Sequence, residues 1–199
     1  MKSFKQHILE KLKVSVRNTT KHTLFPKTKD ELKRMIEDEI SKNGNECSLN
    51  HIDVSRITDM SDLFVKSEFN GDISDWNVSN VKNMEGMFYN SKFNGDISDW
   101  NVSNVKNMKD MFYGSIFSGD ISEWDVSNVK NMRNMFQYSN FNGDISAWDV
   151  SNVTHMPSMF AWSEFNGNIS NWDVSSVTNM SYMFYNSPLE NNPPKWYIE

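Results

Sequence analysis

The sequence repeats itself every 24 residues, and this period constrains the fold more than any other feature. Residues 69–84 read FNGDISDWNVSNVKNM, and residues 93–108 read the same letters. A fixed period of this size is typical of repeat proteins. In such proteins one unit is too small to bury its own apolar face, so each unit packs against its neighbours.

Each repeat begins with a short apolar pattern in which Ile73, Trp76 and Val78 occupy fixed columns. The alternation of Trp and Val predicts a short strand with both side chains facing the core. All these strands would run in the same direction, so we expect a parallel β ladder. The Trp column consists of Trp76, Trp100, Trp124, Trp148, Trp172 and Trp196.

The spacing of apolar residues changes after each strand. Val81, Met84, Met87 and Phe88 lie at i, i+3, i+6 and i+7, which predicts one stripe of a short helix. Asn-Gly and Gly-Asp pairs follow, and these pairs favour turns. One repeat is therefore predicted to be a strand, a helical turn and a glycine-containing turn.

The unit FNGDISxWDVSNVxxMxxMF resembles the BspA-type surface-protein repeat, which also occurs in mycoplasma lipoprotein-like proteins. That family is a divergent relative of leucine-rich repeats, and the resemblance covers about residues 49–198. It implies adhesion or protein binding, with no chemistry and no cofactor. Repeat and resemblance together predict an α/β fold: a right-handed, leucine-rich-repeat-like solenoid with a parallel β ladder, short helices and an N-terminal helical cap.

The chain is expected to have three parts. Residues 1–27 form a basic tail, either an amphipathic helix over 3–14 or a loosely packed segment. Residues 28–48 form a capping helix and turn, because Thr28-x-x-Glu31 is a capping-box pattern and Gly44 is a stop signal. Residues 49–199 form a solenoid of about six 24-residue repeats plus a terminal strand.

Charge is divided unevenly along the chain. Residues 1–47 hold 11 Lys and Arg against 7 Asp and Glu, whereas residues 48–199 hold 9 against 19. The acidic repeat region argues against nucleic-acid binding, which needs a basic surface. No apolar stretch predicts a transmembrane segment or a cleaved signal peptide. A cytoplasmic or virion-associated protein is therefore favoured, although the resemblance implies the cell surface.

Two surfaces are candidate binding sites. The first, the acidic band, comprises outward-facing strand residues, and its alternative role is a solubilising face: Asp75, Asn77, Asp99, Asn101, Glu123, Asp125, Asp149 and Asp173. The second, the aromatic ridge, follows the predicted helices, and its alternative role is to cover them: Tyr89, Tyr113, Tyr138, Trp162 and Tyr185.

Catalysis is not expected, because a repeated column supplies the same residue everywhere and no unique constellation stands out. His155 replaces an Asn of its column without a nucleophile beside it. A column of Gly-Asp pairs could bind Ca²⁺ or stabilise turns, and we favour turns because each repeat supplies one Asp. The column comprises Asp72, Asp96, Asp120 and Asp144.

The expected function is a non-enzymatic protein-interaction or adhesion module, with a protein partner and a glycan as the second ligand class. The alternative is a structural component of a bacteriophage particle or cell envelope, docked by the basic tail. No metal or cofactor is expected, and the sequence leaves the oligomeric state open.

Overall fold

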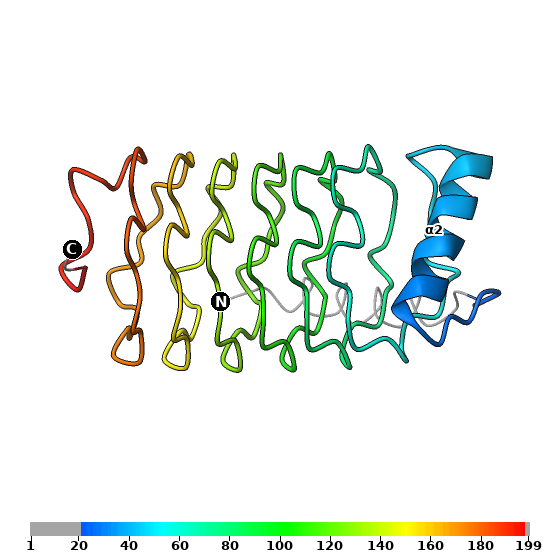
Figure 1. The fold of residues 1–199 in the computed structure, drawn as a ribbon, viewed down its shortest axis with the longest axis horizontal. Coiled ribbons are helices and arrows are strands. Elements are labelled where there is room, and N and C mark those ends of the chain that lie inside the picture. The colour runs from blue at the N-terminus through cyan, green and yellow to red at the C-terminus, as the bar shows by residue number, and fades with distance from the viewer. Residues whose placement is uncertain (1–20, 198–199) are drawn as a thin grey trace, which may run out of the picture.

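The computed structural model describes residues 21–197, and these form a row of stacked coils (Figure 1). Each coil contains 24 residues. Isolated parallel bridges join equivalent residues of neighbouring coils, as between Asn83 and Asn107 or Asn107 and Asn131. The helix α2 (Lys29–Asn43) lies at one end of the row, and the C-terminal residues lie at the other.

The predicted α/β fold, a right-handed leucine-rich-repeat-like solenoid, is wrong. Within residues 21–197 α2 is the only helix, and the bridges are isolated pairs outside any strand. The coils therefore contain neither the expected parallel β ladder nor the expected layer of short helices. They consist of turns and short irregular segments.

Turns on both sides prevent a strand at the Trp and Val columns. The N–H of Trp76 donates to the carbonyl of Ile73 at 3.2 Å, which closes a turn before the tryptophan. The side chain of Asn77 accepts from the N–H of Ser79 at 3.2 Å, which starts another turn directly afterwards. Too few extended residues remain between these turns to make a strand.

Side chains and backbone angles also prevent the predicted helix. The side chain of Asn83 accepts from the N–H of Glu85, which diverts the backbone from helical bonding. Gly86 has a φ of +60°, in the left-handed region. The N–H of Met87 donates to Met84, a separation of three residues typical of turns. Consecutive turns therefore bring the Val and Met columns to one side without a helix.

We call residues 84–90 and their equivalents in the other coils the methionine segment. Four backbone hydrogen bonds join each coil to the next through this segment. In the second coil, the N–H groups of Met84, Gly86, Phe88 and Asn90 donate to carbonyls of the third coil. The same set recurs at all five interfaces, with N···O distances of 2.7–3.1 Å. These N–H groups all face the C-terminal neighbour, and the accepting carbonyls all face the N-terminal one.

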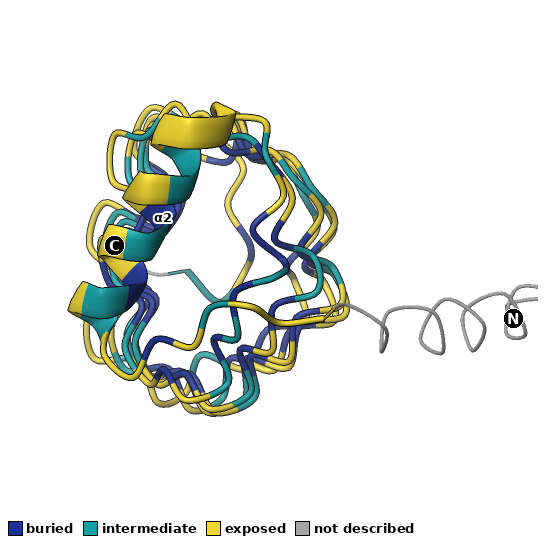
Figure 2. Ribbon diagram, turned by 90° about the vertical axis from the view of Figure 1, so that its right-hand side faces the viewer, coloured by how far each residue is buried: buried dark blue, intermediate teal, exposed yellow. Residues whose placement is uncertain are grey.

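The core consists of the predicted columns, which confirms that the repeated apolar side chains form one continuous interior. Buried and exposed residues alternate along each coil, and the same positions are buried in successive coils (Figure 2). Trp76 to Trp172 are only 3–4% exposed, and each indole N–H donates to an isoleucine or leucine carbonyl of the preceding coil. Phenylalanines stack in the same way, as Phe88 on Phe112 with ring centroids 5.6 Å apart.

The helix predicted before the first repeat forms as α2 and covers the first coil. The side chain of Thr28 accepts from the N–H of Glu31 at 3.2 Å, and Gly44 ends the helix with a φ of +85°. Glu31 accepts from Lys27 rather than from Thr28, so the capping box is only half formed. Leu32 and Ile36 are buried against the core.

The two ends of the chain differ in what the structure describes. Leu24 pairs with Ile52 beside α2, whereas the predicted tail helix over 3–14 lies outside the described residues. At the C-terminal end, the indole of Trp196 donates to Ile169 at 2.9 Å and stacks on Trp172. The predicted terminal strand does not form around Trp196, because residues 187–196 are mainly turns.

Candidate functional site

The aromatic ridge forms a continuous row of rings across five coils. Tyr89 stacks on Tyr113 with centroids 4.6 Å apart, and Tyr113 meets Tyr138 edge-on at 5.5 Å. Trp162 then stacks on Tyr138 at 5.8 Å and meets Tyr185 edge-on at 5.7 Å. The structure therefore brings together all five residues predicted from the sequence.

The second half of the ridge is exposed. Tyr138, Trp162 and Tyr185 are 47–48% accessible to solvent, although aromatic side chains of this size are usually buried. Tyr182, which the sequence analysis missed, is 64% exposed and meets Tyr185 edge-on at 6.1 Å. Its signal in the sequence is a single aromatic residue in a column that otherwise holds polar residues and glycine.

Tyr138 and Trp162 reach the ridge from an unfavourable backbone conformation. Their φ angles are +58° and +57°, in a region that bulky side chains rarely adopt. Gln137 and Ala161 occupy the positions that hold tyrosine in other coils. In these two coils the aromatic residue is therefore the next one along the chain, Tyr138 or Trp162. The row of rings is thus continuous despite the changed column, and strain of this kind often marks functional surfaces.

The phenol of Tyr113 is a neutral hydrogen-bonding group. Burial raises the pKa of Tyr113, and its neighbours Tyr89 and Tyr138 and the charge of Asp110 raise it further. At Tyr113 the ridge therefore offers a ring face together with an uncharged hydroxyl group. Such surfaces suit partners that combine apolar contacts with hydrogen bonds.

Glu85 and Lys109 form an ion pair in the same methionine segments that carry the ridge. The ammonium of Lys109 lies 2.6 Å from Glu85 and 3.5 Å from Asp110. The bond from Lys109 lowers the pKa of Glu85. Sequence reasoning missed this pair, although Glu85 and Lys109 are 24 residues apart and thus share a column.

The acidic band lies mainly at turns rather than on strands, which corrects the predicted setting of its residues. Five members of the band each accept a hydrogen bond from the N–H of the serine two residues later: Asn77, Asn101, Asp125, Asp149 and Asp173. All five are exposed. Asp99 and Glu123 are also exposed, and Asp75 is half-buried.

Two carboxylates of the band are held in their ionised form. Hydrogen bonds from the hydroxyl and the N–H of Ser151 lower the pKa of Asp149. Ser175 lowers the pKa of Asp173 in the same way. Asp149 and Asp173 are therefore negatively charged at neutral pH, and one oxygen of each side chain shapes its turn.

The Gly-Asp column also serves turns. Asp72, Asp96, Asp120 and Asp144 each accept from the N–H of a serine two residues later. Within residues 21–197 no group of three or more His, Cys, Asp or Glu side chains is placed to hold a metal ion.

His155 takes the place of an asparagine in the bridged column. It pairs with Asn131 and Asn179 in parallel bridges, and its Nδ1 lies 2.9 Å from the hydroxyl of Thr154. The side chain is exposed. Its contacts are those of a substituted polar position in the repeat.

Comparison with known proteins gives one match. A family model described as "Mycoplasma protein of unknown function, DUF285" matches residues 30–139 and again residues 115–199. Neither the curated proteins nor the solved structures contain a match to the chain. In the described part of the chain, no helix is long and apolar enough to cross a membrane.

Proposed function

The chain belongs to the DUF285 family of mycoplasma proteins, and from that premise we propose that it is a non-enzymatic binding module for a protein partner. Binding takes place on the aromatic ridge, with the acidic band as a second, electrostatic surface. The resemblance of the repeat to BspA-type surface proteins supports adhesion as the setting of this binding.

One observation carries the proposal, namely the row of five neighbouring rings that ends in three exposed aromatic side chains. Tyr and Trp are enriched at the centres of protein interfaces, because they offer a large contact area with few rotatable bonds. Two of these rings occupy positions where Gly or Asn would be less strained. Stability alone therefore does not account for them.

The acidic band supports a partner with a basic surface. Its carboxylates recur on successive coils, and the region from residue 48 onward has ten more acidic than basic residues. Charges of one sign on exposed positions raise association rates with partners of opposite sign. We therefore propose that the ridge supplies most of the affinity and the band steers the partner.

The test is crosslinking and capture of partners from source cells with the full chain and two variants. The ridge variant carries Tyr138→Ser, Trp162→Ser and Tyr185→Ser. The control variant carries Phe25→Ser and Ile116→Ser, which are also exposed apolar residues but lie off the ridge. We expect a partner that the control retains and the ridge variant loses, with an affinity drop of at least about tenfold.

Retention of that partner by the ridge variant would rule out the ridge. Replacing Asp99, Glu123 and Asp125 by Ser should slow association, and more so at low salt. Unchanged association after this replacement would rule out the role of the acidic band. Loss of binding after glycosidase treatment of the partner would identify a glycan as the ligand instead of the protein surface.

A structural component of a bacteriophage particle or cell envelope is the second proposal, supported by the net charge of +4 over residues 1–47. A basic tail would dock the acidic repeat region to an assembly. Deleting residues 1–20 tests this, because it leaves the pairing of Leu24 with Ile52 intact. The proposal fails if the truncated chain still joins its assembly.

A further inference from the structure

Within residues 21–197, the last coil has no further coil on its C-terminal side. At each inner interface four N–H groups donate to carbonyls of the next coil, as Met156 does to Asn179 and Phe160 to Met183. In the last coil the equivalent groups have no acceptor within residues 21–197. We name these groups the end donors: the N–H groups of Met180, Tyr182, Phe184 and Asn186.

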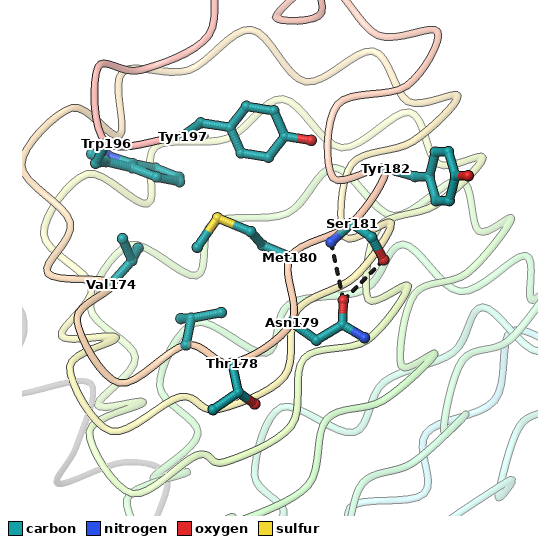
Figure 3. A pocket seen from close by; sticks show the side chains of 9 residues that line it. Val174, Thr178, Asn179, Met180, Ser181, Tyr182, Trp196 and Tyr197 are labelled. Atoms are coloured by element: carbon teal, nitrogen blue, oxygen red, sulfur yellow. Dashed lines mark hydrogen bonds between the residues drawn. The ribbon is translucent and has the colours of Figure 1, made fainter. Parts of the chain in front are cut away.

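A cavity lies beside Met180 and Tyr182, which carry two of the end donors (Figure 3). Its volume is about 820 Å³, and the side chains of Val174, Met180, Trp196 and Tyr197 face one another across it. Val177 also lines the cavity. In inner coils the residues equivalent to Val174, Val177 and Met180 are fully buried, but here they are only half-buried.

The C-terminal residues cover only part of this end. Trp196 stacks on Trp172, and Tyr197 meets Phe184 edge-on at 5.0 Å, so the Trp and Phe columns are closed. Val177, Met180 and Tyr182 are left partly or fully exposed, whereas Met183 and Phe184 are buried. The uncovered part is therefore the first half of the segment through which inner coils hydrogen-bond to one another.

We propose that this open end binds an extended segment of a different protein chain, which adds to the row as a further coil would. Carbonyl groups at alternate residues of that segment accept from the N–H groups of Met180 and Tyr182, and its apolar side chains fill the cavity over Val177 and Met180. Both requirements are met at the inner interfaces. There the equivalent N–H groups donate to carbonyls that are two residues apart, and the Val, Met and Phe side chains are buried. This is recognition by addition to an open backbone edge.

A second copy of this chain does not meet these requirements. The carbonyl side of the row lies at the other end, where α2 covers the first coil through Leu32 and Ile36 (Figure 1). Two C-terminal ends related by a two-fold axis would place end donors against end donors. Donors facing donors leave the buried N–H groups unsatisfied, which is costly.

The test uses a synthetic peptide of residues 128–139 as the probe, because this segment supplies the carbonyls and apolar side chains of an inner interface. Amide hydrogen exchange is measured on the full chain with and without peptide. We expect the amides of Met180 and Tyr182 to exchange faster than their inner counterparts at Met156 and Ser158, and the peptide to slow them by at least about tenfold. Inner amides should not change.

A matched pair of variants locates the binding. Val177→Glu places a charge in the cavity and should weaken peptide binding by at least about tenfold, whereas Ile116→Glu on an exposed site should not. Three results would overturn the proposal: no slowing at saturating peptide, equal slowing by a scrambled peptide, or protection without peptide that rises with protein concentration. The last result would assign the end to a second copy.

Discussion

The indole N–H bonds are the most repeated side-chain contact of the core, and we expect each to contribute to stability. In Trp124→Phe the carbonyl of Ile97 loses the indole donor at 3.1 Å, although it keeps the N–H of Trp100. The smaller ring also leaves a void. We expect a loss of about 1–3 kcal/mol in the free energy of unfolding, measured by urea denaturation.

The matched control is Trp196→Phe, which removes the same kind of bond at the half-buried end of the row. A smaller loss is expected there because solvent can replace the donor. Equal losses in the two variants would contradict a contribution that depends on burial.

Trp162 is the opposite case, a tryptophan whose loss should hardly affect stability. In Trp162→Asn the contacts with Tyr138 and Tyr185 disappear, at about 0.5–1.5 kcal/mol each, but the strain of an aromatic residue at a φ of +57° is relieved. Asn186 has a φ of +51° in the same column. We expect the free energy of unfolding to change by less than about 1 kcal/mol.

Trp148→Ala in the core provides the comparison and should cost about 3–5 kcal/mol. Thermal unfolding followed by calorimetry measures both variants. If Trp162→Asn were as destabilising as Trp148→Ala, the ridge would be part of the core and not a surface available to a partner.

Among the secondary-structure elements, α2 depends on its N-cap. Thr28→Ala removes the acceptor for the N–H of Glu31 and should lower the free energy of unfolding by about 1 kcal/mol. Thr28→Ser keeps the hydroxyl and should restore most of it. Urea denaturation compares the two. A Ser variant as unstable as the Ala variant would show that the methyl group of Thr28, and not its oxygen, is what matters.

The sequence predicted α2 and the core columns but not the local structure of the coils. A capping residue, an apolar stripe and a glycine all favour the same helix, and α2 forms inside the predicted segment of residues 28–48. In the repeats, a spacing of three fits both a helical turn and a series of turns, and the pattern of apolar residues does not separate them. The Asn-x-Ser pattern at Asn77 and the equivalent Asp-x-Ser pattern at Asp125 favour turns, and they are the sequence signal that separates these turns from a strand followed by a helix.

The members of the candidate site could be predicted, but their arrangement could not. The ridge residues were found from their columns, whereas the edge-on and stacked contacts depend on backbone angles that the sequence does not state. The left-handed conformation of Tyr138 is such a case, because a tyrosine gives no signal for it. The open end could not be predicted either, since it depends on which segment carries the bonds between coils.

For the whole molecule, the Asx turns predict a loss of stability in acid. The pKa values of Asp149 and Asp173 are lowered in the folded chain, so the unfolded chain binds protons first as the pH falls. The stabilising contribution is thus present above the ordinary Asp pKa of about 3.9 and is lost as the pH falls through the lower folded value. Urea denaturation between neutral and acidic pH measures this loss.

Asp149→Asn and Asp173→Asn should flatten this pH dependence. Asparagine keeps the turn, as Asn77 and Asn101 do in the same column, but does not titrate. Glu123→Gln serves as a control because it removes one charge of the band from a position outside that column. An equal flattening by Glu123→Gln would show that general repulsion, and not the turns, governs the response to acid.

The four bonds of each methionine segment all point the same way, and they give this side of the molecule an electrical polarity. Each of the bonded peptide units carries a dipole of about 3.5 D, and dipoles that point the same way add along an axis, as they do in an α-helix. Here the axis is the row itself, with the positive pole at the end near Met180 and the negative pole beneath α2. A chain with a surplus of carboxylates thus offers a locally positive pole to groups that accept hydrogen bonds.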